Sequence, residues 1–263
     1  MTQDYFNFPL CPQKFNVPLV QVSDTREIRY LHLGGTAIQS AMKRQAPNTL
    51  LLEYTRAMLG FLLFHAQPRQ LALIGLGGGS LAKFIHHHVL EGVLTAVEIH
   101  PEVVEAARSW FELPPDDARL QVVVGDGVDY VLAHPASQDV LLVDVYDAHK
   151  VVARCVTPAF YQACYDMLRP GGVAVFNLWG SDENYPNYYF ALAAAFHVHV
   201  LQLPPEQQAN IIVFAFKPPL PDTSFAYLAA RAAQLHAQFD VEFDDFLVRM
   251  GEVNLCSDDA FQL

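Results

Sequence analysis

Two carboxylates lie three positions apart at the end of an apolar segment. The apolar run "VLLV" leads directly into Asp144, and Asp147 follows in "DVYD". Carboxylates seldom end a buried strand without a partner or a chemical task. One carboxylate can orient an amine and accept its proton, and a second can hold another ammonium through a charge-assisted hydrogen bond. The spacing therefore favours a cationic amine as substrate, with the alternative that one of the two caps the next turn.

Three further motifs follow predicted strands in the way that nucleotide sites do. A glycine-rich turn, "GLGGGS", spans residues 75–80, and Glu98 ends the next strand 19 positions after Gly79. Glycines let the backbone approach a ligand closely, and an acid at the end of the next strand can accept both ribose hydroxyls. The third motif, "GDG", includes Asp126 and Gly127. An acid there suits the exocyclic amine of adenine, although it could also simply form the turn.

The elements that must position these residues alternate regularly between strand and helix from residue 70 onward. Near-continuous apolar strands separated by helices predict a parallel sheet covered on both faces. The last two strands, "HVHVLQL" and "NIIVFAFKP", are joined by a loop too short for a crossover helix, so they should be antiparallel. We predict an α/β, Rossmann-like fold with a seven-stranded sheet of the methyltransferase type.

The first part of the chain has a different pattern. Three β-rich stretches over residues 16–43 predict a small N-terminal antiparallel β segment, and one helix is expected from Asn48 as its cap to Pro68 as its stop. We therefore divide the chain into a β segment at 1–47 and a Rossmann-like domain at 48–263.

Composition narrows the possible partners. The 263 residues carry a formal net charge of −12, which disfavours nucleic acid and attracts cationic ligands. No apolar run reaches the length of a membrane span, and "MTQDYFNFPLCPQ" lacks the features of a signal peptide. We expect a cytoplasmic protein that binds neither membranes nor nucleic acid. The four cysteines lack metal-site spacing, and no ligand set for a metal is evident.

Together these motifs resemble the spermidine synthase family, the aminopropyltransferases. The resemblance begins at "RYLHLGGTAIQSAM", includes the glycine turn, "VEI", "GDG" and "DVYD", and extends to "LRPGGVAVFNLW". It implies a class I S-adenosylmethionine-dependent transferase fold and a homodimer. The donor would be decarboxylated S-adenosylmethionine, or S-adenosylmethionine itself, and the acceptor a small diamine such as putrescine. The roles implied are donor binding by Gly75, Gly77, Gly79, Glu98, Asp126 and Gly127, catalysis by Asp144 as base, and substrate binding by Asp147, Gln39 and Glu53.

The sequence departs from the pattern of that family at several positions. The family's glycine turn usually carries an Asp that holds the aminopropyl ammonium, and Gly78 stands there. The family's Tyr and His or Gln before the helix glutamate are replaced by Leu51 and Leu52. Ala148, His149 and Lys150 replace the family's proline-rich turn after the second Asp. The adenosine half of the site thus matches the family, whereas the polyamine half differs.

Other functions remain open on the sequence alone. An S-adenosylmethionine-dependent methyltransferase would keep the fold and change the transferred group. A catalytically silent nucleoside-binding paralogue would keep the motifs without turnover. A nicotinamide oxidoreductase is disfavoured by "GDG", "LRPGG" and the terminal hairpin.

Overall fold

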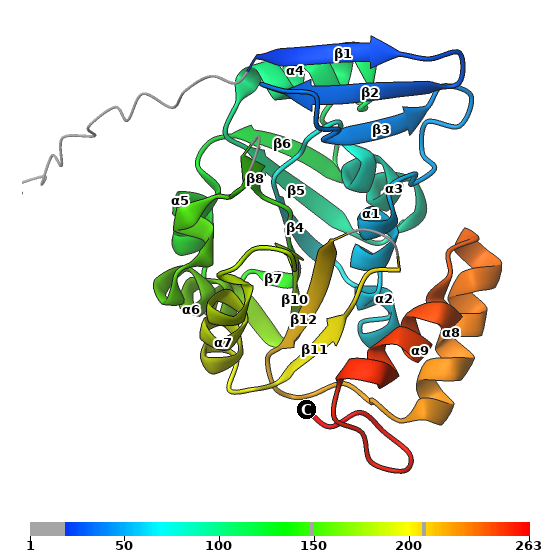
Figure 1. The fold of residues 1–263 in the computed structure, drawn as a ribbon, viewed down its shortest axis with the longest axis vertical. Helices are drawn as coiled ribbons and strands as arrows, with labels where there is room; N and C mark the ends of the chain where they lie inside the picture. Colours follow the sequence, from blue (N-terminus) through cyan, green and yellow to red (C-terminus); the bar gives the residue numbers. More distant parts are fainter. Residues whose placement is uncertain (1–18, 148–149, 207–208) are drawn as a thin grey trace, which may run out of the picture.

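A seven-stranded sheet forms the centre of the molecule (Figure 1). The computed structural model describes residues 19–147, 150–206 and 209–263, with the backbone alone for 146, 147, 150 and 151. The strand order is β11-β12-β10-β7-β4-β5-β6. The strands are β4 (Gln70–Ile74), β5 (Val93–Glu98), β6 (Leu120–Val124), β7 (Gln138–Val143), β10 (Leu168–Trp179), β11 (Val200–Leu203) and β12 (Asn210–Phe216).

The strand directions confirm the predicted sheet. β10, β7, β4, β5 and β6 are parallel to one another, while β12 is antiparallel to both β10 and β11. The five-strand parallel part therefore ends in an antiparallel hairpin, as the short loop between the last two strands required. β7 is the direct neighbour of β4, so Asp144 and the glycine turn follow adjacent strands.

Helices cover both faces of the sheet because strand residues alternate in direction. Leu71 and Leu73 of β4 join one buried cluster, and Ala72 and Ile74 join the other. The first cluster contains residues of α1 (Glu53–Met58), α2 (Phe61–Phe64), α3 (Ser80–His88), α4 (Pro101–Trp110), α8 (Phe225–Phe239) and α9 (Phe243–Val253). The second contains residues of α5 (Gly127–Ala133), the 3₁₀ turn η1 (Ala153–Val156), α6 (Pro158–Met167) and α7 (Tyr185–Ala195).

The N-terminal strands form a separate antiparallel sheet, as predicted. It contains β1 (Val20–Asp24), β2 (Ile28–Leu33) and β3 (Ser40–Lys43) in that order. Figure 1 shows this sheet beside α4 at one end of the molecule. Leu31 and Met42 pack there against Val103, Ala106 and Phe111. The division of the chain at residue 47 stays a prediction.

A buried lysine ties α3 to this packing. Lys83 is only 2% exposed, and its Nζ donates to the carbonyl of Phe111 at 2.6 Å. Its Nζ also lies 3.1 Å from the sulfur of Met42 in β3. Burial lowers the pKa of Lys83 to about 8, because an ammonium loses hydration there.

The single helix predicted from Asn48 to Pro68 is wrong. The structure has two short helices, α1 and α2, separated at Leu59 and Gly60, and the residue before α1 is Leu52. A Cβ on Gly60 would lie 2.5 Å from Cζ of Phe214, so the chain needs glycine to pass closely over β12. Close packing on the sheet has overridden the helical periodicity of this segment.

The strand predicted at "HVHVLQL" begins later than expected. β11 starts at Val200, and the two residues His197 and Val198 have φ angles of 54° and 64°. Such left-handed angles end α7 and turn the chain into the strand. His197 therefore lies in a turn, and His199 directly precedes β11.

The carboxyl ends of β4 and β7 are joined by an unusually close backbone contact. The N–H of Asp144 donates to the carbonyl of Ile74 at 2.9 Å. Gly75 follows with a φ of 92°, and a Cβ there would lie 2.1 Å from the carbonyl oxygen of Asp144. No side chain fits in that space, so Gly75 is required for these two strand ends to meet.

Replacing Gly75 by Ala should lower the free energy of unfolding by about 2 kcal/mol or more, because the left-handed angle and the backbone clash add together. Equilibrium denaturation in urea measures this difference. The matched control is Gly251→Ala in α9, where a Cβ meets no atom within 4 Å. That change should stabilise the protein by about 0.5–1 kcal/mol through helix propensity. Equal stabilities for Gly75→Ala and the wild type would contradict this account of the joint.

Candidate functional site

The residues predicted to bind the donor, together with Asp144, lie at the carboxyl edge of the parallel strands. Gly75 directly follows β4, Glu98 ends β5, Asp126 follows β6 after one residue, and Asp144 directly follows β7. Ligands in open α/β sheets bind outside this edge. The topology thus brings the glycine turn and three acidic side chains to one end of the sheet.

The glycine turn forms the start of α3. Gly75, Gly77 and Gly79 all have left-handed φ angles, of 92°, 52° and 74°, and Gly79 is the residue that precedes the helix. The first turn of α3 therefore has free backbone N–H groups directed toward the sheet edge.

The N-terminal sheet supports this turn from outside. The N–H of Gly78 donates to Oγ of Ser40 at 2.8 Å, and Ser40 is buried in β3. A Cβ on Gly78 would lie 2.9 Å from Cβ of Ser40 and 3.1 Å from a ring carbon of Phe111. The side chain that the spermidine synthase pattern carries at this position therefore has no room here. Gln39 is half-buried and immediately precedes Ser40. Its backbone N–H donates to the carbonyl of Leu31.

Glu98 uses its carboxylate to shape the turn. Oε2 accepts from the N–H of Leu76 at 3.0 Å, and Oε1 accepts from the N–H of His100 at 3.0 Å. The residue is 8% exposed, so these bonds compensate a buried charge. Each carboxylate oxygen has a second lone pair and can therefore accept one further hydrogen bond, for example from a hydroxyl group.

Asp126 caps α5 and forms an ion pair that the sequence did not reveal. Its Oδ1 accepts from the N–H groups of Val128 at 2.8 Å and Asp129 at 3.3 Å. Its Oδ2 pairs with Arg154 of η1, which also reaches Asp129 at 3.1 Å. Gly127 lets α5 pack on β4, since a Cβ there would lie 2.2 Å from a methyl carbon of Ile74.

Asp144 has the environment expected of a proton acceptor. Nδ2 of Asn177 in β10 donates to its Oδ1 at 2.9 Å, and Tyr54 of α1 also hydrogen-bonds the carboxylate. Burial raises the pKa of Asp144 to about 6; the two hydrogen bonds lower it in part, and the charge of Glu98 raises it further. The carboxyl is therefore mostly ionised at neutral pH and still able to accept a proton.

Two asparagines extend this contact across the sheet. Nδ2 of Asn210, the first residue of β12, donates to Oδ1 of Asn177 at 2.9 Å. This bond leaves the Nδ2 group of Asn177 directed at Asp144. Sequence reasoning missed Asn177 and Tyr54; the signal for Asn177 was one amide in the apolar run "VAVFNLW".

The second carboxylate of "DVYD" is placed only by its backbone. Asp147 belongs to β8 (Tyr146–Asp147), which pairs with β9 (Lys150–Val151) so that Asp147 lies opposite Lys150. The side chains of both lie outside the described residues, as do Ala148 and His149 entirely. The role of Asp147 as an amine anchor stays a prediction.

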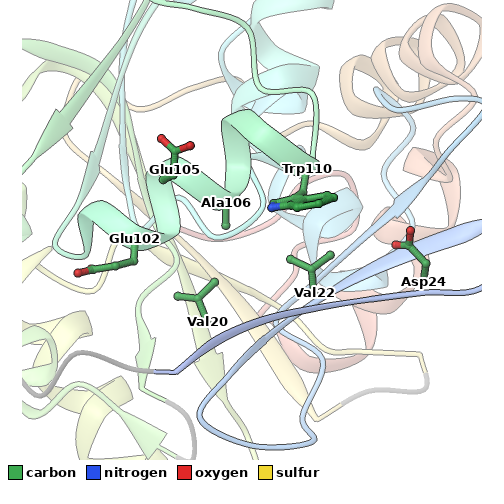
Figure 2. A pocket seen from close by; sticks show the side chains of 7 residues that line it. All are labelled: Val20, Val22, Asp24, Glu102, Glu105, Ala106 and Trp110. Carbon is green, nitrogen blue, oxygen red and sulfur yellow. The ribbon is translucent and has the colours of Figure 1, made fainter.

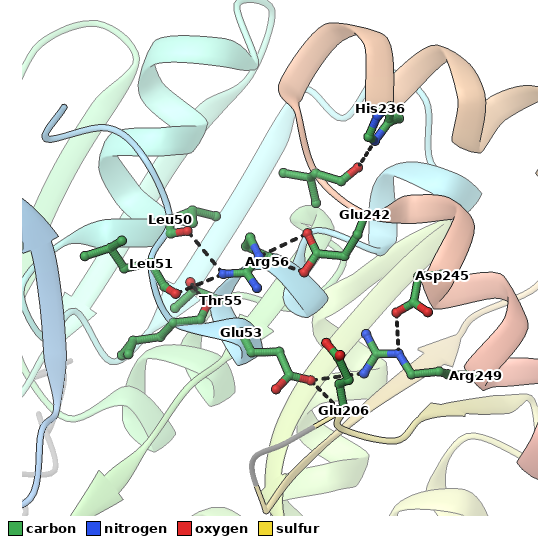
Figure 3. Close-up of polar contacts among 12 residues, drawn as sticks. Leu50, Leu51, Glu53, Thr55, Arg56, Glu206, His236, Glu242, Asp245 and Arg249 are labelled. Carbon is green, nitrogen blue, oxygen red and sulfur yellow. Dashed lines mark hydrogen bonds and ion pairs between the residues drawn. The ribbon is translucent and has the colours of Figure 1, made fainter.

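Glu53 forms hydrogen bonds and an ion pair with residues far along the chain (Figure 3). Its Oε1 accepts from Nη1 of Arg249 in α9 at 3.0 Å and from the N–H of Glu206 at 2.5 Å. Arg249 also lies 2.9 Å from Asp245 (Figure 3). It donates as well to the carbonyl of Pro204 at 2.8 Å. The glutamate predicted to bind substrate is thus one half of a buried ion pair.

Two hollows in the surface lie away from these residues. One of about 590 Å³ lies between β1 and α4 and is lined by Val20, Val22, Asp24, Glu102, Glu105, Ala106 and Trp110 (Figure 2). Another, of about 260 Å³, includes Lys83, His86 and Glu112. None of the predicted site residues lines either, so the site is assigned from its chemistry and its place in the fold.

In the part of the chain that the structure describes, no group of three His, Cys, Asp or Glu side chains is arranged to hold a metal ion. Cys155 and Cys164 are buried free thiols, and Cys256 is exposed. No helix among these residues is both long and apolar enough to cross a membrane.

Comparison with solved structures defines the class of protein. Human methyltransferase-like protein 13 in complex with SAH is 27% identical, with a TM-score of 0.63 over 72% of this chain and 93% of that one. Spermidine synthase from Thermotoga maritima is 20% identical, with a TM-score of 0.63 over 88% of this chain and 84% of that one. The fold is therefore that of methyltransferase-like transferases.

Sequence comparison gives the family. The sequence model of the spermine/spermidine synthase domain matches residues 52–190. The polyamine aminopropyltransferase of Chromobacterium violaceum is 38% identical over 238 residues, which are 90% of this chain and 91% of that protein. The chain belongs to the spermine/spermidine synthase family, and it is a transferase enzyme with a donor of the S-adenosylmethionine type.

The raised pKa of Asp144 predicts a measurable effect on stability. Its folded pKa lies above the unfolded value, so the carboxyl stabilises the fold below about pH 4 and this stabilisation is lost as the pH rises through about 6. Asp144→Asn mimics the protonated form. The variant should be more stable than the wild type by about 3 kcal/mol at pH 8, and the difference should vanish below pH 4. Urea denaturation at several pH values measures it.

Asp139 provides a control of opposite sign. Burial acts to raise its pKa, but hydrogen bonds from the N–H groups of Gln70 and Arg69 and the charge of Arg169 outweigh burial and hold the pKa below its ordinary value. Asp139→Asn should therefore lose stability at pH 8. If both variants were less stable than the wild type at pH 8, the charge of Asp144 would not be destabilising the fold.

Proposed function

We propose that this protein transfers the aminopropyl group of decarboxylated S-adenosylmethionine to a diamine such as putrescine, with Asp144 as the general base. The observation that carries the proposal is the position of Asp144. It lies against the glycine turn at the sheet edge and is oriented by Asn177 and Tyr54, with a pKa of about 6.

The nucleoside half of the site fits such a donor. The left-handed glycines keep side chains away from the start of α3, and Gly75, Gly77 and Gly79 would border the donor there. Both oxygens of Glu98 keep a lone pair for the ribose hydroxyls. Asp126 and Gly127 are at the next strand end, where a carboxylate can accept from the adenine amine. The donor supplies a sulfonium that makes the adjacent carbon open to attack.

The chemical step needs positioning and one proton acceptor. The amine nitrogen of the acceptor forms a bond to the propyl carbon next to sulfur as the carbon–sulfur bond breaks. The electron pair of that bond stays on sulfur, which leaves neutral methylthioadenosine. The nitrogen loses its proton to Asp144, whose pKa near 6 suits a base at neutral pH. Asp147 and Gln39 would hold the rest of the acceptor.

Methyl transfer from S-adenosylmethionine is a second candidate. Gly78 favours it, because Ser40 and Phe111 leave no room for the carboxylate that would hold an aminopropyl ammonium. A solved relative of the same fold is described as methyltransferase-like and as a complex with SAH. The transferred group therefore has to be determined by product analysis.

The deciding experiment supplies both donors together with a mixture of amines. Mass spectrometry should detect methylthioadenosine and a diamine lengthened by one aminopropyl group. Asp144→Asn should lower kcat by roughly 100-fold or more, the usual contribution of a positioned base. S-adenosylhomocysteine as the main nucleoside product would instead assign methyl transfer.

The pH dependence of the reaction tests the base directly. kcat/KM should fall below about pH 6 as Asp144 becomes protonated in the free enzyme. Asn177→Leu removes the bond that lowers this pKa, so the acid limb should move to higher pH. An acid limb that stays in place in Asn177→Leu would argue against Asp144 as the titrating group.

We also propose that the protein forms a homodimer in the cytoplasm through the N-terminal sheet. Supporting it, β1 is an edge strand of its sheet, and the hollow beside it is lined by the partly buried Val20 and Val22 and the exposed Trp110 (Figure 2). Light scattering should give twice the mass of one chain, which is 29.4 kDa. A mass of one chain would refute the dimer.

A further inference from the structure

A buried ammonium without a carboxylate partner lies in α3. Lys83 is 2% exposed; its Nζ donates to the carbonyl of Phe111 at 2.6 Å and lies 3.1 Å from the sulfur of Met42, a weak acceptor. Among the described residues, Lys83 forms no ion pair with an aspartate or glutamate. Buried charges are ordinarily paired, and an ammonium has three donors, so this one can serve a further acceptor.

Lys83 forms part of the wall of the surface hollow of about 260 Å³. The residues predicted to bind the donor or the acceptor do not line this hollow, so it is separate from the carboxyl edge of the sheet. Its other lining residues are Pro47, Asn48, His86, His87, Glu112 and Pro114.

Glu112 supplies a negative charge to this hollow. It is exposed, has a left-handed φ of 57°, and directly follows Phe111, whose carbonyl accepts from Lys83. Left-handed angles are costly for a residue with a side chain and are often kept at ligand sites. Burial lowers the pKa of Lys83 to about 8, and the charge of Glu112 acts in the opposite direction. The carboxylate is thus near the ammonium without being bonded to it.

The other charges around the hollow are already matched. Nε2 of His86 lies 2.9 Å from a carboxylate oxygen of Asp117. Arg29, whose charge also interacts with Glu112, donates two hydrogen bonds to the carboxylate of Asp24, at 2.8 Å and 2.7 Å. Imidazoles are mostly uncharged above pH 7. The hollow therefore retains one ammonium and one carboxylate, with a net charge of zero between them.

These opposite charges disfavour simple ions. An anion attracted by Lys83 is repelled by Glu112, and the net charge of −12 on the chain opposes it further. A cation attracted by Glu112 is repelled by Lys83 in the same way. A ligand that has a carboxylate and an ammonium on the same carbon atom can form a charge-assisted hydrogen bond with each of the two residues.

We propose that this hollow binds a zwitterionic α-amino acid, whose carboxylate accepts from Lys83 and whose ammonium donates to Glu112. The amide of Asn48, in the same wall, can bond to either group. Pro47 and Pro114 provide apolar surface for the side chain of the amino acid. The proposal is independent of the group that the enzyme transfers.

Isothermal titration calorimetry of the full chain at neutral pH tests the proposal with glycine, L-leucine, L-methionine and L-glutamine. At least one of them should bind with a Kd of about 1 mM or tighter. Its N-acetyl derivative lacks the ammonium, and its amide derivative lacks the carboxylate. Each derivative should bind roughly tenfold more weakly, because each loses one charge-assisted hydrogen bond.

Two substitutions assign the contacts. Glu112→Gln should weaken the binding of that amino acid by roughly tenfold and strengthen the binding of its N-acetyl derivative, because a repulsive charge is removed. Lys83→Met should weaken the binding of both. The matched controls are Glu91→Gln and Lys43→Met, which alter exposed residues outside the hollow and should leave the affinities unchanged.

Three results would overturn the inference. The first is an absence of binding for all four amino acids at about 10 mM. The second is an affinity that stays the same in Glu112→Gln, since the amino acid then binds elsewhere. The third is an N-acetyl derivative that binds the wild type as tightly as the amino acid, which would define a site for simple anions. If Lys83→Met does not fold, Glu112→Gln and the two derivatives still decide.

Discussion

The structure depends on the contact between the strand ends of β4 and β7. Gly75 turns left-handed against the carbonyl of Asp144, and the N–H of Asp144 is bound to Ile74. This joint places the carboxylate of Asp144 beside the glycine turn that precedes α3. A negative charge and the backbone N–H groups at the start of a helix therefore lie at the same edge of the sheet. The Glu98 carboxylate then holds the turn from the other side. Asn177 and Tyr54 in turn contact the carboxylate that this joint positions.

Burying the carboxylate of Asp144 at this joint costs free energy, and hydrogen bonds from its neighbours offset part of that cost. Asn177 and Tyr54 donate to Asp144, but burial still raises its pKa to about 6. The same burial is what makes the group useful as a proton acceptor near neutral pH. Glu53 and Asp126 illustrate a different solution, in which an arginine is brought from another element to balance the charge. Carboxylates in this part of the molecule thus differ in whether an amide or a cation contacts them.

Much of the fold could be predicted from the sequence because it depends on periodic patterns. The parallel strands, the terminal antiparallel hairpin and the N-terminal sheet all followed from apolar runs and loop lengths. The helix at 48–68 could not be predicted correctly, since its break at Gly60 reflects contact with Phe214 in β12. Likewise, the positions of Asp144, Glu98 and Asp126 at the carboxyl edge of the sheet could be predicted because each lies at or just after a strand end. Arg154 and Arg249 were missed, since their partners are 28 and 196 positions away and no local pattern connects them.

The ion pair of Glu53 and Arg249 also bears on how the chain is assembled. A ribosome makes Glu53 196 residues before Arg249, after which the sheet, its crossovers and the hairpin must all be synthesised. Until α9 has been synthesised, Glu53 lacks its arginine partner and the carbonyl of Pro204 lacks its donor. In a nascent chain with the whole sheet formed, the Glu53 carboxylate would therefore depend on water to balance its charge. Translation of α9 is the event that replaces this water with a fixed cation.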